Sequence, residues 1–436
     1  MATGHTIVVG GGIVGVSTAY YLARRGHRVT LVERGELGAG ASGGNAGIVA
    51  IGHPPMPRPG LVRQVLKWML NGGSPLYVPP RFDPALFRWL WDFRRACTED
   101  KFRRSMNVLA ALGRETRACF EQIMSDESMT CEFHRGGWRE VFRTEAGLAE
   151  GRVAAEILQE HDFDIEILDG DELRRREPVF RDDVVGAVQY TDSSFTDPLQ
   201  FLLELAEKAR GHGAVLHTNA RIVDTLVSGG RFRAVRLHSG EQFQGDTLVL
   251  AAGIWTTQLA RQLGISVPMQ AGKGYHRNVT RPSPCLGVAS VLSEKHVAVT
   301  PMGDVLRLSG TVEFSGINDR LNRRRLDMLS AAARTYLKGV GQCRTVSEWC
   351  GLRPCTADGL PVVGWAPGLT GVFLATGHAR MGFTLGPVTG RLASECILDG
   401  KPSVDITALR ADRFGTRRRN LDTARRRGNT DMTSRV

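Results

Sequence analysis

Continuous apolar runs and apolar positions at helical spacing follow one another at the start of the chain. The segment Thr6–Gly10 (TIVVG) is unbroken in Val and Ile, as expected of a buried parallel strand. Ile13–Arg25 has helical spacing and ends before Gly26, a residue that commonly closes helices. Arg28–Glu33 (RVTLVE) is a second apolar run. The pattern therefore predicts a strand, a helix and a second strand, a βαβ unit.

The next region changes character. Residues 51–80 are rich in Pro, and residues 81–125 have helical spacing, with Leu86, Leu90 and Phe93 on one face. We expect a second domain to begin here, inserted after the βαβ unit. Its tryptophans are interpreted as core or interface aromatics rather than cofactor contacts; they are Trp68, Trp89 and Trp91.

The second half of the chain mixes strands and helices. After Asp197-Pro198, Leu199–Arg210 predicts a helix closed by Gly211, and Ser228-Gly229-Gly230 predicts a hairpin turn. The expected segments are strands at Ala214–Thr218, Arg221–Val227, Phe232–His238 and Thr247–Leu250, a strand-rich region at 268–345, a helix at Arg320–Lys338, and two apolar strands with a last helix at 346–400.

The glycines between the first strand and the first helix fit the pattern G-x-G-x-x-G. Gly10 permits a tight turn, Gly12 lets the backbone approach a pyrophosphate, and Gly15 allows the helix to pack on the strand. The exposed amides, with Ile13 and Val14 at the positive end of the helix, are then expected to bind a diphosphate. A glycine-rich structural turn is the alternative interpretation.

An acidic residue ends the second predicted strand. Glu33 lies 18 residues after Gly15, where a carboxylate can bind the ribose hydroxyls. Its charge argues against the 2′-phosphate of NADP. We also expect a cofactor contact at the neighbouring Arg34.

A second run of small residues favours FAD over NAD. The segment 38–47 (GAGASGGNAG) can lie flat against the diphosphate and the flavin ring. Ser42 and Asn45 are expected to donate hydrogen bonds, and Ala46 and Gly47 complete the predicted contact. A flexible loop is the alternative.

These patterns predict an α/β fold, in which an FAD-binding Rossmann-type (βαβ) domain is interleaved with an α+β substrate domain on a mixed or antiparallel sheet. The length of 436 residues agrees with two domains, because single cores stop growing at about 250–300 residues. We expect the FAD-binding domain at 1–50, 195–267 and 346–410, and the substrate domain at 51–194 and 268–345.

The net charge is +11, and much of the excess is concentrated at the end of the chain. We interpret residues 411–436 as a solvated, poorly ordered tail. Contact with an anionic membrane surface is a second interpretation, and nucleic-acid binding is not expected. The arginines concerned are Arg410, Arg413, Arg417, Arg418, Arg419, Arg425, Arg426, Arg427 and Arg435.

The eight cysteines contain no Cys-x-x-Cys pair, so no zinc or iron–sulfur site is predicted. Reduced thiols in a cytoplasmic enzyme are the simplest interpretation. The first strand begins too early to leave room for a secretory signal, and no apolar run approaches the roughly 20 residues that span a bilayer. We therefore expect a protein that is at most peripherally associated with a membrane.

With these motifs in place, the sequence resembles the D-amino acid oxidase/dehydrogenase superfamily of FAD-dependent oxidoreductases, especially bacterial D-amino acid dehydrogenase and glycine oxidase. The motifs occur in the family's order and cover nearly the whole chain except the tail. They are GGGIVG at 10–15, ASGGNAG at 41–47, LAAGIW at 250–255, GKGY at 272–275, GLRP at 351–354, DGLP at 358–361 and GHARMG at 377–382.

The resemblance implies a set of further cofactor contacts. It places the Val223 backbone at the adenosine, with Glu33. The remaining positions lie near the dinucleotide or the isoalloxazine ring: Ala251, Gly253, Gly377, Met381, Gly382 and Thr384. Some relatives attach their flavin through a cysteine, but no cysteine here matches that setting, so noncovalent FAD is expected.

The segment Gly386-Pro387 precedes the helical run Val388–Leu398. Proline is favoured in the first turn of a helix, so we expect the last helix to begin near Pro387. A helix N-terminus aimed at N1 and O2 of the reduced flavin would stabilise its negative charge. An ordinary capped helix is the alternative.

Two arginines are candidates for binding a substrate carboxylate. Arg353 lies between apolar neighbours, and Pro354 biases it toward an extended backbone, so its fork is expected to point into a cavity. The resemblance implies that Arg353 binds the substrate carboxylate and that Arg380 is a second arginine over the flavin. His296 and Tyr275 are expected on the substrate face. A structural role remains the alternative for each.

The resemblance implies oxidative deamination of a small amino acid, with a D-amino acid foremost. The clamped substrate would pass hydride from its α-carbon to flavin N5, and the imine would hydrolyse to a 2-oxo acid and ammonia; no metal is needed. Oxidation of a secondary amine or imino acid (sarcosine, proline, D-hydroxyproline) or of a 2-hydroxy acid stays open. So does the acceptor, oxygen or a quinone-linked chain. A basic RNA-modifying flavoprotein is a remote alternative.

Overall fold

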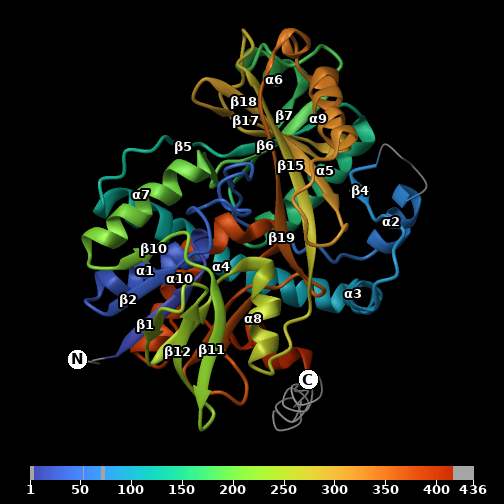
Figure 1. Cartoon of the computed structure of the whole chain (residues 1–436). Coiled ribbons are helices and arrows are strands. Elements are labelled where there is room, and N and C mark those ends of the chain that lie inside the picture. Colours follow the sequence, from blue (N-terminus) through green and yellow to red (C-terminus); the bar gives the residue numbers. More distant parts are fainter. Residues whose placement is uncertain (1–3, 53, 70–73, 416–436) are drawn as a thin grey trace, which may run out of the picture.

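The computed structural model describes residues 4–52, 54–69 and 74–415, with the backbone alone at 66–69. Figure 1 shows two lobes. A six-stranded sheet with its helices forms the lower lobe, and most of a nine-stranded sheet forms the upper lobe. The long strands β15 and β19 run from one lobe toward the other. The predicted α/β fold is therefore confirmed.

The N-terminal βαβ unit forms as predicted, within one residue at most boundaries. Strand β1 (His5–Val9) leads into α1 (Ile13–Arg24), and β2 (Arg28–Val32) pairs with β1 in parallel. Gly26 adopts φ +73°, the left-handed conformation that ends a helix at low cost in a residue without Cβ.

The six-stranded sheet gathers strands from distant parts of the chain in the order β10-β2-β1-β14-β21-β20. All pairings are parallel except β20 with β21. The added strands are β10 (Val215–His217), β14 (Thr247–Leu250), β20 (Val362–Trp365) and β21 (Val372–Thr376). The carboxyl ends of β1 and β14 therefore meet at one edge, where ligands bind in such sheets.

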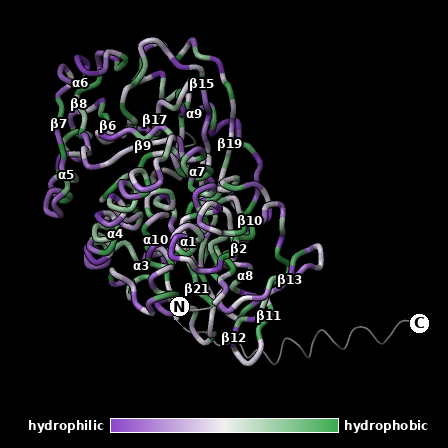
Figure 2. The backbone as a smooth tube through the Cα atoms, turned by 90° about the vertical axis from the view of Figure 1, so that its left-hand side faces the viewer, coloured by the Kyte–Doolittle hydropathy of each residue, from purple (hydrophilic) through white to green (hydrophobic). Residues whose placement is uncertain are grey.

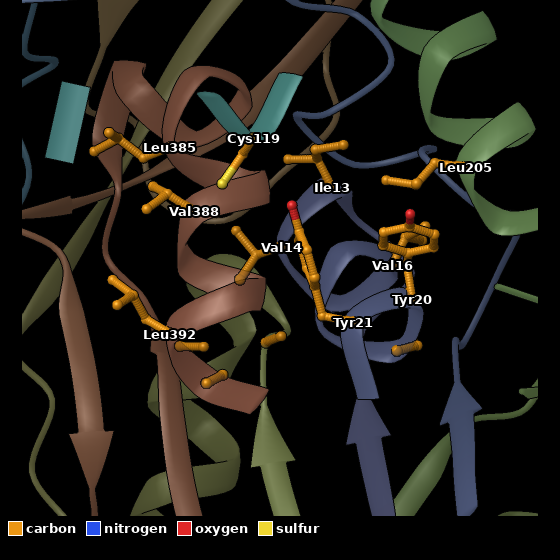
Figure 3. Close-up of a cluster of buried hydrophobic side chains, with 14 of the residues drawn as sticks. Ile13, Val14, Val16, Tyr20, Tyr21, Cys119, Leu205, Leu385, Val388 and Leu392 are labelled. Carbon is orange, nitrogen blue, oxygen red and sulfur yellow. The ribbon is translucent and has the colours of Figure 1, made fainter. Parts of the chain in front are cut away.

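Helix α1 is buried almost completely, between α10 (Gly382–Leu398) and α7 (Pro198–Gly211) (Figure 3). The contact with α10 is close because glycine lines it. A Cβ on Gly390 would lie 2.5 Å from the backbone carbon of Ser17, and one on Gly386 would lie 2.7 Å from a side-chain carbon of Ile13. This packing holds the N-termini of α1 and α10 in fixed positions.

The predicted start of the last helix is wrong. Helix α10 begins at Gly382, about one turn before Pro387, which lies inside the helix. The preference of proline for the first turn suggested the later start, but a proline here removes only one hydrogen bond of the helix, the one that its own N–H would donate. The real N-terminus follows a 3₁₀ turn, Ala379–Met381.

The nine-stranded sheet is mixed, as predicted for the substrate domain. Its order is β19-β15-β18-β17-β16-β6-β8-β7, and β4 pairs with β18. Neighbours are antiparallel except β16 with β6 and β18 with β4. The strands are β4 (Leu76–Tyr77), β6 (Trp138–Phe142), β7 (Ile165–Asp169), β8 (Gly186–Tyr190), β15 (Met269–Thr280), β16 (Ser290–Leu292), β17 (Val297–Met302), β18 (Val305–Glu313) and β19 (Thr345–Thr356).

Two elements cross the predicted domain boundaries. Strand β19 was placed with the FAD-binding domain, but it belongs to the nine-stranded sheet. Helix α4 (Glu99–Asp126) was placed with the substrate domain, yet Leu109, Phe120 and Ile123 on it join the core around α1 and α10. Pairing partners decide such membership, and they are far away in the sequence.

The remaining elements complete the covering layers. Two small sheets have the orders β3-β9-β5 and β11-β12-β13. Their strands are β3 (Ile48–Val49), β5 (Phe133–Arg135), β9 (Ser194–Thr196), β11 (Ile222–Ser228), β12 (Arg231–Leu237) and β13 (Gln242–Gln244). The helices are α2 (Leu61–Met69), α3 (Pro84–Ala96), α5 (Glu145–Gln159), α6 (Gly170–Arg176), α8 (Thr256–Gln262) and α9 (Arg323–Tyr336).

Hydrophobic and hydrophilic stretches are short and interspersed along the chain (Figure 2). Among the residues that the structure describes, none of the helices has both the length and the apolar character of a membrane span. The basic tail lies almost wholly outside the described residues, so the prediction for it stays a prediction.

Candidate active site

The glycine turn at the end of β1 is fixed by contacts that leave no room for side chains. Gly10 has φ +116°, and a Cβ on it would lie 2.5 Å from the Ala251 carbonyl oxygen. A Cβ on Gly15 would lie 1.9 Å from the Gly10 carbonyl oxygen. Gly12 caps α1 with no side-chain bond, and its amide donates to no acceptor within the described residues. The N-terminus of α1 is thus open to an anion.

Glu33 holds this turn from the end of β2. Its carboxylate accepts hydrogen bonds from the amides of Gly11 (2.6 Å) and Gly35 (2.9 Å). Next to it, the guanidinium carbon of Arg34 lies 3.7 Å from the ring centroid of Trp255, a cation–π contact. The sequence predicted the positions of Glu33 and Arg34 at this edge, but not Trp255.

Val223 lies at an irregularity in the pairing of β11 with β12. The register of β11 against β12 shifts between Ile222 and Asp224, which leaves Val223 without a partner residue. Such a bulge interrupts the ladder and leaves backbone groups unpaired. This fits the predicted adenosine contact, which stays a prediction.

The second glycine-rich loop uses its predicted donors to hold itself together. The Asn45 amide donates to the Ser42 carbonyl at 2.6 Å, and its oxygen accepts from the Gly47 amide at 2.7 Å. The Ser42 hydroxyl oxygen accepts from the Ile13 amide at 3.0 Å, so its own proton remains available. Asn45 therefore shapes the loop, and Ser42 links it to the N-terminus of α1.

The nine-stranded sheet braces the same loop from the other side. His276 Nδ1 donates to the Gly44 carbonyl, Arg307 Nη1 to that of Asn45 and Thr300 Oγ1 to that of Ala46, each at 2.8 Å. Burial, and then the charge of Arg307, lower the pKa of His276 to about 4, so the ring is neutral near pH 7. Three successive carbonyls are thus turned toward the sheet.

The other predicted cofactor positions lie close to these two loops. The Ala251 amide donates to the Val9 carbonyl at 2.9 Å, beside the glycine turn. Gly253 (φ +55°) accepts from the Thr376 hydroxyl at 2.9 Å, and Gly377 (φ +80°) follows Thr376. Met381, Gly382 and Thr384 form the cap and first turn of α10, and Thr384 Oγ1 accepts from the Ala50 amide at 3.3 Å. An open helix terminus, a ribose-side carboxylate and a small-residue loop fit an FAD diphosphate and ring.

Arg353 lies on β19 with its guanidinium against the backbone of β15. A Cβ on Gly274 would lie 2.2 Å from Arg353 Nη1, so the glycine makes room for this side chain. Nη1 donates to the Thr311 carbonyl at 3.0 Å. Burial lowers the pKa of Arg353, and no carboxylate within the described residues forms an ion pair with it. A half-buried cation without an anion is a ready carboxylate site.

The register of the sheet identifies the other residues on this face. On β15, Gly272 and His276 lie on the same side of the sheet, and Gly272 pairs with Arg353 of β19. In the other direction the same side continues through the pairs His276–Ser309, Ser309–Ala298, Ala298–Val291 and Val291–Glu140. Because paired residues share a face, Arg353 and Glu140 both lie on the side that carries His276, Arg307 and Thr300. That side faces the glycine-rich loop.

Arg380 lies beside Arg353 in the turn before α10. Its Nη2 donates to the Pro54 carbonyl at 2.9 Å. Burial first, then the charge of Arg58, lower the pKa of Arg380 to about 10, and Arg353 acts in the same direction. Arg380 is nevertheless solvent-accessible.

Glu140 is a carboxyl that lies close enough to this group of arginines to raise the pKa of Arg380. The Tyr190 hydroxyl donates to it at 3.4 Å. Burial raises its pKa, against the opposing effects of the Tyr190 hydrogen bond and of Arg380 and Arg58. The site therefore combines an excess of positive charge with one carboxyl that is costly to ionise.

The two remaining candidates are placed differently. His296 belongs to the group: burial, then Arg58 and Arg380, lower its pKa to about 4, although the residue as a whole is exposed. Tyr275 lies on the opposite face of β15 from Arg353, in the core beneath α9, where its hydroxyl donates to Glu313 at 2.8 Å. The structure does not bring Tyr275 to the other candidates.

Backbone strain is concentrated in the same place. Of the six non-glycine residues with positive φ in the described part of the chain, three belong here: Thr311 (+57°), His296 (+52°) and Ala379 (+47°). Such conformations cost about 1–3 kcal/mol each and are typical of functional sites.

Sequence reasoning missed Arg58, Glu140 and Tyr190. Arg58 lies in the Pro-rich segment, and the other two lie on strands 50 residues apart in the sequence. No local motif marks them. The GKGY motif did contain a signal, because Gly274 is the residue against which Arg353 packs.

Comparison with known proteins agrees with this geometry. The family described as FAD dependent oxidoreductase matches residues 5–396. The D-amino acid dehydrogenase of Agrobacterium fabrum (strain C58 / ATCC 33970) is 30% identical over 419 residues, covering 94% of this chain and 99% of the relative. That of Rhodopseudomonas palustris (strain HaA2) is 32% identical over 420 residues, covering 94% and 97%.

Solved structures share the fold at lower identity. Glycine oxidase from Geobacillus kaustophilus superimposes with a TM-score of 0.74 at 22% identity, covering 96% of this chain and 100% of that one. L-proline dehydrogenase from P. horikoshii gives 0.73 at 17% identity, covering 94% and 98%. At these identities the likeness concerns the fold alone.

Proposed function

Because the chain belongs to the family of FAD dependent oxidoreductases, we propose that it oxidises a small D-amino acid to the corresponding 2-oxo acid and ammonia. The D-amino acid dehydrogenases that are 30% and 32% identical over nearly its whole length support this substrate class. The observation that carries the proposal is the guanidinium of Arg353, which packs on Gly274, lies on the side of the sheet that faces the glycine-rich loop, and forms no ion pair with any residue that the structure describes.

The cofactor would be held without a covalent bond. The turn at Gly10–Gly15 and the open end of α1 would bind the diphosphate, and Glu33 the ribose. The loop at 42–47 and the first turn of α10, from Gly382 to Thr384, would lie along the ring. FAD supplies the two-electron acceptor of the reaction. The protein supplies its orientation.

Arg353 would bind the substrate carboxylate through both arms of its fork, with Arg380 as a second cation beside it. The Thr311 carbonyl fixes the guanidinium of Arg353 at 3.0 Å. Holding the carboxylate fixes where the α-carbon and the amino group lie, which is the main contribution that a positioned cation makes to such a reaction. Burial and the charges of Arg58 and Arg380 lower the pKa of His296 to about 4, so its ring is neutral near pH 7 and adds no further positive charge beside the two arginines.

The chemistry balances without a metal. The amino acid loses two electrons and two protons to give an imino acid, and water then adds to the C=N bond and ammonia leaves. Within the described residues, no cluster of His, Cys, Asp or Glu could hold a metal ion. An arginine can bind any α-carboxylate, so the chirality of the substrate and the nature of its amine must be measured.

The test is a substrate panel on the purified protein with FAD, in the absence of oxygen. Bleaching of the flavin absorbance is followed with D-alanine, L-alanine, glycine, sarcosine, D-proline and D-lactate. We expect D-alanine to bleach the flavin faster than L-alanine, and D-lactate not at all. Faster bleaching by sarcosine or D-proline would show that the substrate is a secondary rather than a primary amine. Bleaching by L-alanine alone would overturn the proposal. Oxygen uptake measured beside reduction of a quinone analogue then identifies the acceptor.

The carboxylate role is tested separately with Arg353→Ala and Arg353→Lys. We expect kcat/KM to fall about 10³-fold in the alanine variant, the cost of roughly 4 kcal/mol for a lost charged contact, with FAD still bound. Lysine keeps the charge without the fork and should recover part of this loss. Arg103→Ala, which removes an exposed arginine paired with Glu99 on α4, is the matched control.

A further inference from the structure

Helix α3 carries large aromatic side chains on its outer face that nothing in the described structure covers. The exposed fractions are 90% for Phe82, 54% for Phe87 and 58% for Trp91. Phe87 and Trp91 are four residues apart, so they lie on the same side of the helix. Phe82, just before the helix, contacts the ring of Phe87, with centroids 6.4 Å apart. This group is the aromatic face of α3.

The exposure does not come from a poorly anchored helix. Asp83 caps α3, accepting from the amides of Ala85 and Leu86 at 3.1 Å. The inner face buries Trp89 and Phe93, which stack with their centroids 5.2 Å apart, and the Trp89 indole donates to the Cys355 carbonyl at 2.9 Å. The two faces of α3 thus differ: the inner face fixes the helix to β19, and the outer face has no structural role within the described part of the chain.

Positive charge surrounds the aromatic face. Arg88, Arg94 and Arg95 are exposed on the same helix, against one acidic residue of α3, Asp92, and the guanidinium carbon of Arg94 lies 5.7 Å from the ring centroid of Trp91. The start of α4 adds exposed Lys101, Arg103 and Arg104 against Glu99 and Asp100. In both views α3 lies at the edge of the molecule (Figures 1 and 2). An approaching flat surface would therefore meet aromatic rings between arginines.

We propose that the aromatic face of α3 and its flanking arginines dock the protein on a membrane surface rich in anionic lipids. Tryptophan and phenylalanine insert at the level of the lipid headgroups, and arginines beside them attract anionic headgroups. This docking is peripheral, by one helix that lies in the interface. It is independent of the substrate and of the role of Arg353.

A second copy of the chain fits the face less well. A symmetric contact between two α3 helices would bring Arg88, Arg94 and Arg95 of both copies together, and like charges at an interface repel. An anionic membrane has the opposite charge to the patch. The aromatic side chains and the arginines would then both favour binding to the membrane.

The experiment is co-sedimentation of the full-length protein, loaded with FAD, with vesicles of phosphatidylcholine alone or mixed with phosphatidylglycerol. We expect binding to the mixed vesicles only. The double variant Phe87→Ser/Trp91→Ser should reduce the partition coefficient roughly tenfold or more, because two apolar side chains are lost from the interface. The triple variant Arg88→Gln/Arg94→Gln/Arg95→Gln should remove the preference for phosphatidylglycerol.

The matched control is Val153→Ser/Ile157→Ser, which changes two exposed apolar residues, also four apart, on α5. This control should bind vesicles like the unchanged protein, and all variants should keep their bound FAD and their helix content by circular dichroism. Binding that survives in the Phe87/Trp91 variant would overturn the proposal and assign the membrane contact to another segment such as the basic tail. A dimer that dissociates in that variant, without vesicle binding, would assign the face to a second copy.

Discussion

Two regions of this protein are proposed to bind an anion, and they would do so by opposite means. The turn at Gly10–Gly15 offers backbone amides at the open end of α1, and its glycines touch neighbouring backbone directly. The proposed carboxylate site offers the side chains of Arg353 and Arg380, each held by a hydrogen bond to a carbonyl, of Thr311 and of Pro54 respectively. The glycine turn is rigid because neighbouring backbone leaves no room for a further atom. The arginine side chains are positioned by their hydrogen bonds to backbone carbonyls.

The two regions are therefore expected to respond differently to substitutions that add an atom. An added atom in the glycine turn has to displace backbone, so the damage spreads into the fold. An added atom at the carboxylate site displaces a side chain, so binding suffers while the fold survives. The first region is also local in sequence, whereas the second draws on β15, β18, β19, the turn before α10 and the Pro-rich segment.

The largest effect is expected for Gly15→Ala. Its Cβ would lie 1.9 Å from the Gly10 carbonyl oxygen, so the turn must move. We expect a loss of about 3 kcal/mol or more in the free energy of unfolding, and a protein purified without flavin colour. Gly211→Ala is the matched control, because this glycine also lies in a helix but has nothing within 4 Å of its Cβ. It should change stability by less than about 1 kcal/mol. Equal flavin content in the two variants would remove the distinction between the regions.

Gly274→Ala tests the other half of the comparison. Its Cβ would lie 2.2 Å from Arg353 Nη1, and a guanidinium can swing away where backbone cannot. We expect the flavin to stay bound and kcat/KM to fall roughly 10- to 100-fold, mainly through KM, for a misplacement worth about 1–3 kcal/mol. Gly341→Ala, with open space around its Cβ, is the control. A variant that loses its flavin instead would place Gly274 in the cofactor region.

Glu140→Gln sharpens the electrostatic side of the comparison. Burial raises the pKa of Glu140 above its ordinary value of 4.5, although Tyr190, Arg380 and Arg58 act against this shift. The folded protein therefore holds this proton to higher pH than the unfolded chain, and its stability falls as pH rises from about 4.5 through the raised pKa.

The Gln variant lacks this titration. Urea unfolding over a pH series should show the two proteins diverging in favour of Gln as pH rises, with little difference near pH 4. Divergence in favour of Glu would mean that the neighbouring arginines outweigh burial, and that the carboxylate is charged in the site.

The local region could be predicted from the sequence, and the assembled region only in part. The strand, glycine turn, helix and strand of residues 5–32 were expected within one residue, because consecutive residues form them. Motifs also pointed to Arg353 and Arg380, whose roles stay predictions. Glu140 was not, because only the pairing of β6 with β16 and of β16 with β17 brings it to the face of Arg353.

Strand register also explains the position of Tyr275. Tyr275 is next to Gly274 in sequence, and that single step reverses the side of the sheet to which its side chain points. Asn45 was expected to donate a hydrogen bond to the cofactor; one N–H of its amide is used within its own loop, and a bond from the second N–H stays a prediction. A motif locates a segment, and it does not say which of its atoms are already occupied by neighbours.

The smallest effect is expected where the two regions touch. Thr300 on β17 donates its hydroxyl to the Ala46 carbonyl at 2.8 Å, so a strand of the substrate sheet holds a loop of the cofactor site. Thr300→Val keeps the shape and leaves that carbonyl without its partner, at a cost of about 1 kcal/mol. If the sheet holds the loop in place, this cost appears in FAD affinity, as a roughly fivefold weaker Kd, while KM for the substrate hardly changes.

The control is Thr335→Val, which removes a hydroxyl that donates to the Ala332 carbonyl within α9, at 2.7 Å. It should lower stability without changing FAD affinity. FAD titration of the apoproteins separates the two. Should both variants bind FAD equally well, the sheet would be a neighbour of the cofactor loop rather than its support, and the two anion sites would be energetically independent.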